Sequence, residues 1–458
     1  MSTDTASPRS ARRKHGLTSA ERPDPIGRAV NLLSLLAGST VLDRWGLRKP
    51  TERVVFESTK TGFRTLGALN RQFAKAPRRR PPSGGTPDRA AHAARRDAFD
   101  LTPTDDEQML LGVATEFATE VLRPAAADAD DAARPPAELL AASREIGLPI
   151  LGVPESAGGV STQRSAMAGT LVAEALAKGD MGLAVATLAP GAVSTALSLW
   201  GSAEQQAGFL PAFTGDDVPA AALALTEPHP LFDPLVPAAT ATRDGDAIVL
   251  QGTKSMVPLG ADAELFVAGA MLDGEPRLLL VESGAGGVEI EAEPSMGLRA
   301  ASLSRLVLSE VRVSADAVLG TADDYRECVR LARLAWCALA VGTAQAVLDY
   351  VIPYVNEREA FGEPVSHRQG VAFMVADIGI ELDAMRLVTY RAASRATQGR
   401  SFAREVALAR RLCAERGMQI GNDGVQLLGG HGFVKEHPVE RWYRDLRAIG
   451  VAEGGVLV

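Results

Sequence analysis

The chain has few of the residues that build disulfide or metal-centred scaffolds. Three cysteines (Cys328, Cys337 and Cys413) are spread over 458 residues, which excludes a disulfide framework and a CxxC site and fits a reducing cytosol. The six histidines have no spacing typical of metal ligands, so we predict no metal. No GxGxxG motif is present, so the sequence does not support a Rossmann nucleotide-binding domain.

The sequence also has no segment typical of a targeting signal or of a membrane-spanning helix. The apolar run within Arg28–Leu47 is too short for a membrane span of about 20 residues. No hydrophobic core with a small-residue cleavage site follows the initial methionine, so we predict no secretory signal. With 46% hydrophobic and 23% charged residues, the composition is that of a soluble globular protein. We therefore expect a cytoplasmic protein.

The net charge of −8 conceals two oppositely charged parts. Through Asp97 the chain has 20 Lys and Arg against 8 Asp and Glu, which is +12; the remainder has 48 − 20 = 28 basic and 56 − 8 = 48 acidic residues, which is −20. Such a basic head can meet a membrane surface, nucleic acid or the acidic body. Of these three possible partners, we do not expect nucleic acid. Peripheral membrane contact through residues 1–99, with Trp45 and the leucines of Val30–Leu47 inserted, is weighed equally against packing on the body or a partner subunit.

Hydrophobic periodicity divides the chain into four segments, which predict an α+β multidomain protein. Residues 1–99 form a basic N-terminal extension and linker, and residues 100–217 form an N-terminal α-helical domain. Residues 218–321 contain short β-rich runs separated by Gly, Asp and Pro and form a middle β domain. Long helical periodicity returns over residues 322–458, a C-terminal helical bundle. A helix is predicted to begin at Thr104 with a Thr-x-x-Glu signal and to stop at Pro124.

One carboxylate near the end of the sequence stands out as a candidate general base. A glycine-rich turn over residues 429–432 is followed by a charged segment and then by Glu453, between Ala452 and Gly454. Neighbours with so little side chain leave the carboxylate free to face a pocket, as a base must do to reach a substrate proton. From the local residues alone, an ordinary surface glutamate is the alternative.

Three other segments have residue types that can contact a bound ligand. The turn at Leu225–Thr226 can donate hydrogen bonds to polar ligand atoms. A guanidinium such as that of Arg358 suits a pyrophosphate, and Gly429 and Gly430 allow close backbone approach. Taken singly, each has a structural alternative: a solvated helix end for Arg358, a core position for Phe361 and a helix C-cap for the glycines.

Taken together, these motifs resemble the acyl-CoA dehydrogenase family, in family order over about three quarters of the chain. The matching segments are Gly147-Leu148 with Val153-Pro154-Glu155 and Gly158-Gly159, then Leu225-Thr226-Glu227-Pro228, then Arg358-x-x-Phe361-Gly362 with Gln369, and finally Gln426-x-x-Gly429-Gly430-x-Gly432 followed by Arg444-Asp445. In the family the catalytic Glu stands nine residues after that Arg, which here is Glu453. The position of an alternative base used by some members is Ala332, followed by Arg333.

The resemblance implies a fold, a cofactor and a reaction. The fold is an N-terminal α-helical domain, a middle β-barrel-like domain and a C-terminal four-helix bundle, and the cofactor is FAD. The implied reaction is α,β-dehydrogenation of an acyl thioester carried by CoA or an acyl carrier protein, with Glu453 as the α-proton base and an electron-transfer flavoprotein as acceptor. The implied assembly is a homodimer or homotetramer, because in the family the arginine and the Q-x-x-GG turn grip FAD bound mainly by the neighbouring subunit. The implied cofactor-binding residues are Leu225, Thr226, Met256, Pro258, Arg358, Phe361, Gln369, Gln426, Gly429 and Gly430, and the implied substrate-binding residues are Arg305 and Gly454.

Several positions depart from the family pattern. Phe232 replaces a serine after the L-T-E-P loop, Pro258 replaces a hydroxyl residue and offers no N–H, and Gly455 replaces a threonine after the base. The departures leave two alternatives open. One is a catalytically degenerate subunit of a hetero-oligomer with an active relative, and the other is a different flavin-dependent oxidation on the same fold.

Overall fold

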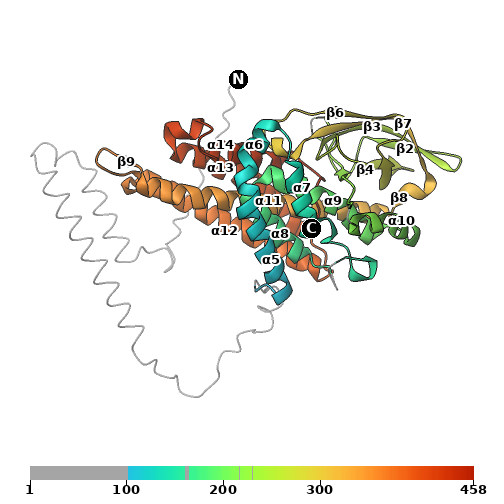
Figure 1. Cartoon of the computed structure of the whole chain (residues 1–458), viewed down its shortest axis with the longest axis horizontal. Coiled ribbons are helices and arrows are strands. Elements are labelled where there is room, and N and C mark those ends of the chain that lie inside the picture. Colours follow the sequence, from blue (N-terminus) through green and yellow to red (C-terminus); the bar gives the residue numbers. More distant parts are fainter. Residues whose placement is uncertain (1–101, 160–163, 216, 230) are drawn as a thin grey trace, which may run out of the picture. The chain divides into compact units, whose positions relative to one another are not determined.

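The computed structural model describes residues 102–159, 164–215, 217–229 and 231–458 (Figure 1). The predictions for the basic extension, residues 1–99, lie outside the described residues. The described residues, from 102 onward, form one compact unit.

The first part of this unit is helical, as predicted. Its helices are α5 (Asp105–Phe117), α6 (Arg123–Ala132), α7 (Ala137–Glu145), α8 (Ala166–Gly179), α9 (Met181–Trp200) and α10 (Ala203–Thr214). The predicted start at Thr104 is confirmed by a reciprocal capping box. The Thr104 hydroxyl accepts from the Glu107 N–H at 3.2 Å, and the Glu107 carboxylate accepts from the Thr104 N–H at 2.9 Å.

The predicted stop at Pro124 is wrong. A single π-helical turn, Ala118–Leu122, joins α5 to α6, and Pro124 lies in the first turn of α6. A proline is tolerated there because the wider turn replaces the regular hydrogen-bond ladder that its missing N–H would interrupt. The helical rod therefore continues to Ala132 and brings Asp130 into contact with later parts of the chain.

The middle part is an eight-stranded sheet with the order β6-β7-β3-β2-β4-β5-β8, and β1 pairs with β4. Its strands are β1 (Ala221–Ala224), β2 (Thr240–Asp244), β3 (Ala247–Val257), β4 (Leu265–Leu272), β5 (Glu275–Glu282), β6 (Val288–Ala292), β7 (Ser304–Ser314) and β8 (Val318–Leu319). The predicted β-rich runs correspond to β3, β4, β5, β6 and β7; in order they are Ala247–Leu250, Leu265–Ala268, Arg277–Val281, Val288–Ile290 and Leu306–Val311. Strands β1, β2 and β8 were not predicted. Strand β1 is Ala-Ala-Leu-Ala, and alanine is uncommon in strands, whereas β2 is largely polar and β8 has only two residues.

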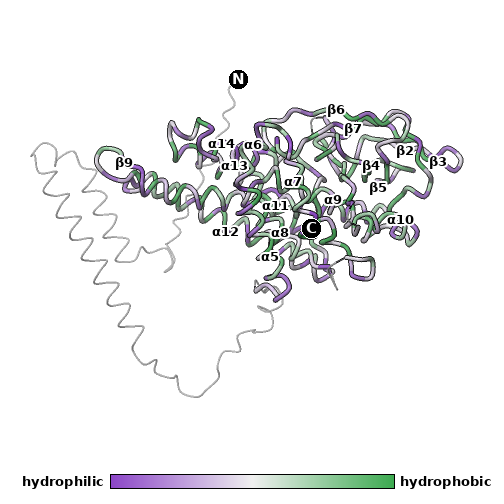
Figure 2. The backbone as a smooth tube through the Cα atoms, in the orientation of Figure 1, coloured by the Kyte–Doolittle hydropathy of each residue, from purple (hydrophilic) through white to green (hydrophobic). Residues whose placement is uncertain are grey.

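The last part is a four-helix bundle of α11 (Ala322–Glu357), α12 (Gln369–Thr397), α13 (Ala403–Leu427) and α14 (Val439–Leu446). Helix α11 contacts α8, α12, α13 and α14 and is the central helix of the unit (Figure 1). Figure 2 shows how hydrophobic residues recur along these helices. Helices α9 and α11 are long and apolar enough for a membrane span, but 83% of each apolar window is buried inside the protein, so both are core helices.

Candidate active site

Glu453 lies where the helical parts meet the sheet. Its main-chain N–H donates to the Thr226 hydroxyl oxygen at 2.9 Å, and that hydroxyl donates to the Glu453 carbonyl at 2.6 Å. The next residue, Gly454, forms an antiparallel bridge with Ala224 at the end of β1. Its φ is +69°, and a Cβ there would lie 2.9 Å from the Cβ of Leu225, so this position requires glycine. The structure thus brings together Leu225, Thr226, Glu453 and Gly454, as the sequence predicts.

The Glu453 carboxylate is buried and held by two arginines from the bundle. Its side chain is 9% exposed. Arg333 of α11 donates from Nε to both carboxylate oxygens at 3.0 Å, and Arg410 of α13 donates from Nη2 at 3.4 Å. These charge-assisted hydrogen bonds fix the direction of the carboxylate, and an oriented carboxylate is the group that general-base catalysis requires.

The sequence motifs do not mark Arg410 as a functional residue, and they include Arg333 only as the neighbour of Ala332. Arg410 also donates to the Ala452 carbonyl at 2.5 Å, so it positions the backbone that carries Glu453. Its Nη1 is buried and has no hydrogen-bond partner within the part of the chain that the structure describes. No motif signals Arg410, because its relation to Glu453 depends on the packing of α13.

Two further predicted cofactor contacts lie beside this cluster. The Pro258 ring lies against Gly455, where a Cβ would be 3.5 Å from the proline Cγ. Met256 has a φ of +53°, and its N–H donates to the Glu293 carboxylate at 2.6 Å. Arg305, predicted to bind substrate, donates from Nε to the same carboxylate at 2.9 Å. Arg305 is therefore linked to Met256 through Glu293 rather than to Glu453.

A second cluster gathers the residues predicted to grip a pyrophosphate. Arg358, Gln426, Gly429 and Gly430 line one cavity of about 420 Å³, between the end of α11, α12 and the turn after α13. Gly429 has a φ of +57°, which favours glycine. A guanidinium beside a backbone turn that is open for close approach fits a dinucleotide phosphate.

Of the remaining two predicted cofactor residues, Gln369 lies next to that cavity, and Phe361 lies in the exposed turn between the paired segments Glu359–Ala360 and Glu363–Pro364. Gln369 is the first residue of α12, directly before Gly370, which lines the cavity. Phe361 has a φ of +58° and is 98% exposed, with the Arg368 guanidinium 5.8 Å from its ring centre. An aromatic ring so exposed is not the core residue that its type suggests, and it is available to a partner surface.

The two clusters are far apart within one chain. Arg333, which holds Glu453, and Arg358, which lines the second cavity, are both placed by α11. At a rise of about 1.5 Å per residue they are separated by about 37 Å along the helix. One FAD molecule does not span that distance, so a single chain does not close both ends of one cofactor site.

The Arg444–Asp445 pair of the motif has a structural role. Arg444 donates to both oxygens of Asp130 in α6, at 3.0 and 2.8 Å. Asp445 accepts from the Leu298 N–H at 2.6 Å, and the preceding turn of α14 places Arg441 3.0 Å from Asp180. These contacts join α14 to the helical part and to the loop before β7, which positions the segment that leads to Glu453.

Asp445 is expected to make stability depend on pH. Burial, together with the nearby charge of Asp180, raises the pKa of Asp445 from 3.8 to about 8. The folded protein therefore holds a proton that the unfolded chain has released, so this contribution to stability is full below about pH 4 and is lost as pH rises through about 8.

We expect Asp445→Asn to remove this dependence, because the amide stays neutral and still accepts from the Leu298 N–H. The wild-type free energy of unfolding should fall by up to about 1.4 kcal/mol per pH unit in this window, and that of the variant should fall less. Urea denaturation at pH 5, 6.5 and 8 measures the slopes, with the exposed Asp128→Asn on α6 as control. Parallel curves for wild type and Asp445→Asn contradict the assignment.

Three family models match the described unit in order. The N-terminal domain of acyl-CoA dehydrogenase matches residues 104–216, the middle domain residues 222–311 and the C-terminal domain residues 324–455. Together they account for each of the three parts of the fold.

Individual proteins agree with these matches. The mitochondrial short-chain specific acyl-CoA dehydrogenase of Bos taurus is 31% identical over 76% of this chain and 87% of its own length. The structure of butyryl-CoA dehydrogenase from Megasphaera elsdenii is similar with a TM-score of 0.71 and 26% identity, covering 77% of this chain and 95% of that one. A glutaryl-CoA dehydrogenase from Mycobacterium smegmatis, solved in complex with FADH2, has a TM-score of 0.69 and 25% identity, covering 76% and 90%.

Proposed function

The chain belongs to the acyl-CoA dehydrogenase family, and from this premise we propose that it removes the α and β hydrogens of an acyl thioester with Glu453 as the base. It is an oxidoreductase of the class that acts on CH–CH donors. The carrier of the acyl group is CoA or an acyl carrier protein. The observation that carries the proposal is the buried Glu453 carboxylate, held in a fixed direction beside the Thr226 turn.

The residues of this chain supply the proton transfer and the positioning. Glu453 accepts the α-proton of the thioester, and Arg333 and Arg410 keep its carboxylate from rotating away. Thr226 fixes the main chain of Glu453 through both its N–H and its carbonyl. Trp336 and Leu225, both buried, wall the site with apolar surface and exclude water from the reacting carbons.

FAD is the cofactor of the family, and when bound it takes up the β-hydride. In this chain the Leu225–Thr226 turn and Pro258 would lie at the ring end of one FAD. Arg358, Gln426, Gly429 and Gly430 would hold the phosphate end of the FAD seated on a partner subunit. Pro258 offers no N–H, and the Thr226 hydroxyl is engaged with Glu453. The ring end would therefore be held mainly by shape and main-chain groups. We propose an electron-transfer flavoprotein as the acceptor of the electrons.

The proposed assembly is a homodimer or homotetramer. The separation of about 37 Å between the two clusters supports it, because each cofactor then draws its ring-end contacts from one subunit and its Arg358 contact from another. An exposed apolar stripe supports it as well. Phe373, Ile380 and Leu387, every seventh residue of α12, are 58%, 66% and 49% exposed, and such a stripe is typical of a helix that packs against a partner.

Arg358→Ala is expected to weaken FAD retention by tenfold or more. Loss of a charge-assisted contact to a phosphate costs roughly 1.5–3 kcal/mol of binding free energy. Equilibrium dialysis against FAD measures the dissociation constant, and the exposed Arg411→Ala of α13 is the matched control. Equal affinity of wild type and Arg358→Ala rules out a cofactor at this cavity.

The test of the function itself is spectroscopic. The purified chain, saturated with FAD, is expected to lose flavin absorbance when butyryl-CoA is added without oxygen. A chain that never takes up FAD supports the degenerate subunit of a hetero-oligomer. A chain that holds FAD but is reduced by no acyl thioester supports a different flavin-dependent oxidation.

A further inference from the structure

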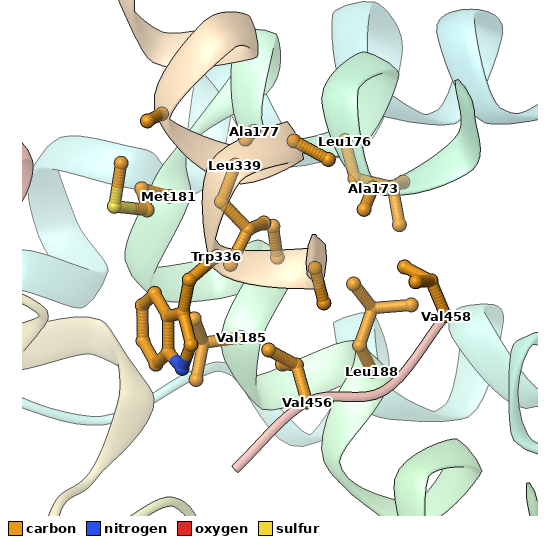
Figure 3. Close-up of a cluster of buried hydrophobic side chains, with 14 of the residues drawn as sticks. Ala173, Leu176, Ala177, Met181, Val185, Leu188, Trp336, Leu339, Val456 and Val458 are labelled. Atoms are coloured by element: carbon orange, nitrogen blue, oxygen red, sulfur yellow. The ribbon is translucent and has the colours of Figure 1, made fainter. Parts of the chain in front are cut away.

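The segment directly after Glu453 runs through the interior of the protein. Val456, Leu457 and Val458 are 0%, 8% and 6% exposed. Figure 3 shows Val456 beside Val185 and Trp336, and Val458 beside Ala173 and Leu188. The walls around the segment thus come from α8, α9 and α11. Residues 454–458, which directly follow the proposed base Glu453, therefore fill the apolar space between these three helices.

Main-chain hydrogen bonds hold this segment along its length. The Gly455 N–H donates to the Leu223 carbonyl at 3.0 Å, and the Trp336 indole N–H donates to the Gly454 carbonyl at 2.8 Å. Further on, the Arg164 guanidinium donates to the Val458 carbonyl. A segment fixed at both ends and buried between them is a structural wall rather than a mobile flap.

A large cavity borders the last two residues of this segment. Its volume is about 840 Å³, and it is lined by residues of α5, α8 and α9 together with Leu457 and Val458. Leu188 lines the cavity and also lies beside Val458 in Figure 3. Leu457 and Val458 thus separate the apolar surface of α9 and α11 around Val456 from a space whose wall is partly apolar and partly charged, with Asp106, Glu107 and Arg164 among its residues.

We propose that Val456, Leu457 and Val458 form the closed end of the acyl subsite and restrict this chain to short acyl thioesters. The inference rests on the proposed function. A thioester whose α-carbon meets Glu453 must direct its acyl chain toward apolar surface, and the surface of Val185, Leu188 and Trp336 is already covered by this segment. Each additional methylene of an acyl chain contributes only the free energy of burying one apolar group. To make room for it, the whole segment must be displaced, which exposes the side chains of Val456, Leu457 and Val458 and breaks the segment's hydrogen bonds.

The experiment compares chain lengths in the FAD-loaded protein. Flavin reduction by butyryl-CoA, octanoyl-CoA and dodecanoyl-CoA is measured for wild type and for the double variant Val456→Ala/Val458→Ala. We expect wild type to prefer butyryl-CoA, and the variant to raise kcat/KM for dodecanoyl-CoA relative to butyryl-CoA by about tenfold or more, because the smaller side chains open the way to the cavity. Val451→Ala, at a position 51% exposed, is the control and should keep the wild-type preference.

Hydrogen exchange of the wild type gives a second measurement that does not depend on the folding of the variant. The amides of Gly455 and Val456 should remain protected with butyryl-CoA and with dodecanoyl-CoA at equal concentration. Equal oxidation of both thioesters by wild type, or loss of that protection with dodecanoyl-CoA, overturns the proposal. Absence of flavin reduction with every thioester contradicts the proposed function instead, and the exchange measurement with dodecanoyl-CoA then still decides whether the segment is a fixed wall.

Discussion

Replacing Glu453 with glutamine is expected to lower acyl-CoA-dependent flavin reduction by about 10²–10⁴-fold in a protein that still folds and takes up FAD, with some loss of stability because Arg333 and Arg410 lose their charged partner. The amide has the size of the carboxylate but does not accept the α-proton, and loss of a general base costs that much. The main-chain contacts of Glu453 with Thr226 do not involve the side chain and persist in the variant. Stopped-flow loss of flavin absorbance under saturating butyryl-CoA measures the effect.

The matched control for this variant is Glu436→Gln, an exposed glutamate in the loop before α14. It should reduce its flavin at the wild-type rate. The melting temperature and the FAD content of Glu453→Gln separate a chemical effect from a loss of structure. A Glu453→Gln protein that reduces its flavin nearly as fast as wild type shows that another group takes the proton, and Glu453 is then not the base.

The fold could be predicted from the sequence because its elements carry strong local patterns. Helical periodicity within residues 322–458 predicts long helices over Tyr325–Val355 and Arg368–Gln398, and these correspond to α11 and α12 almost to their ends. The β-rich runs correspond to β3 to β7, which are rich in Val, Leu and Ile. Prediction failed at Pro124, where a π-helical turn allowed the helix to continue, and at β1, whose sequence Ala-Ala-Leu-Ala has little β propensity.

Only part of the candidate site could be predicted from the sequence. The residues that fall in short motifs could be identified, but the side chains that form hydrogen bonds with them lie outside those motifs. Glu453 and Thr226 are 227 positions apart, and each was identified from its own segment. Arg410, whose guanidinium meets the Glu453 carboxylate, belongs to no motif. Residues 454–458 likewise give no local sign that they are buried, since a Gly-Gly-Val-Leu-Val run is compatible with a surface strand as well as with an interior segment.

A second large effect is expected at the buried ion pair beneath the Thr226 turn. Lys254 of β3 donates to Glu227 at 2.7 Å, and their side chains are 0% and 2% exposed. Burial alone would raise the pKa of Glu227, but the charge and hydrogen bond of Lys254 outweigh it and hold that pKa below its ordinary value. Burial lowers the pKa of Lys254, and Glu227 offsets part of this. Each of the two buried side chains therefore stays charged because the opposite charge lies beside it.

Lys254→Met is expected to lower the free energy of unfolding by about 3–5 kcal/mol, because it leaves the Glu227 carboxylate buried without its cation. The double variant Glu227→Gln/Lys254→Met should recover a large part of that loss, since no charge is then buried. Urea denaturation of wild type, both single variants and the double variant at pH 7 measures the cycle. Arg243→Met, which breaks an exposed ion pair with Asp273, is the control and should cost less than about 1 kcal/mol.

The outcome of this cycle also bears on the site, because Glu227 does more than neutralise Lys254. Its carboxylate accepts from the N–H groups of Ala238 and Ala239, at 2.8 and 2.9 Å, so it ties the turn that carries Thr226 to the loop before β2. A glutamine side chain has only one acceptor oxygen, so at this position it accepts from one of these two N–H groups and leaves the other without that hydrogen bond. The double variant should therefore regain stability but bind FAD less tightly than wild type. Full recovery of both properties contradicts a positioning role for Glu227, and a double variant no more stable than Lys254→Met contradicts the buried charge as the cause of the loss.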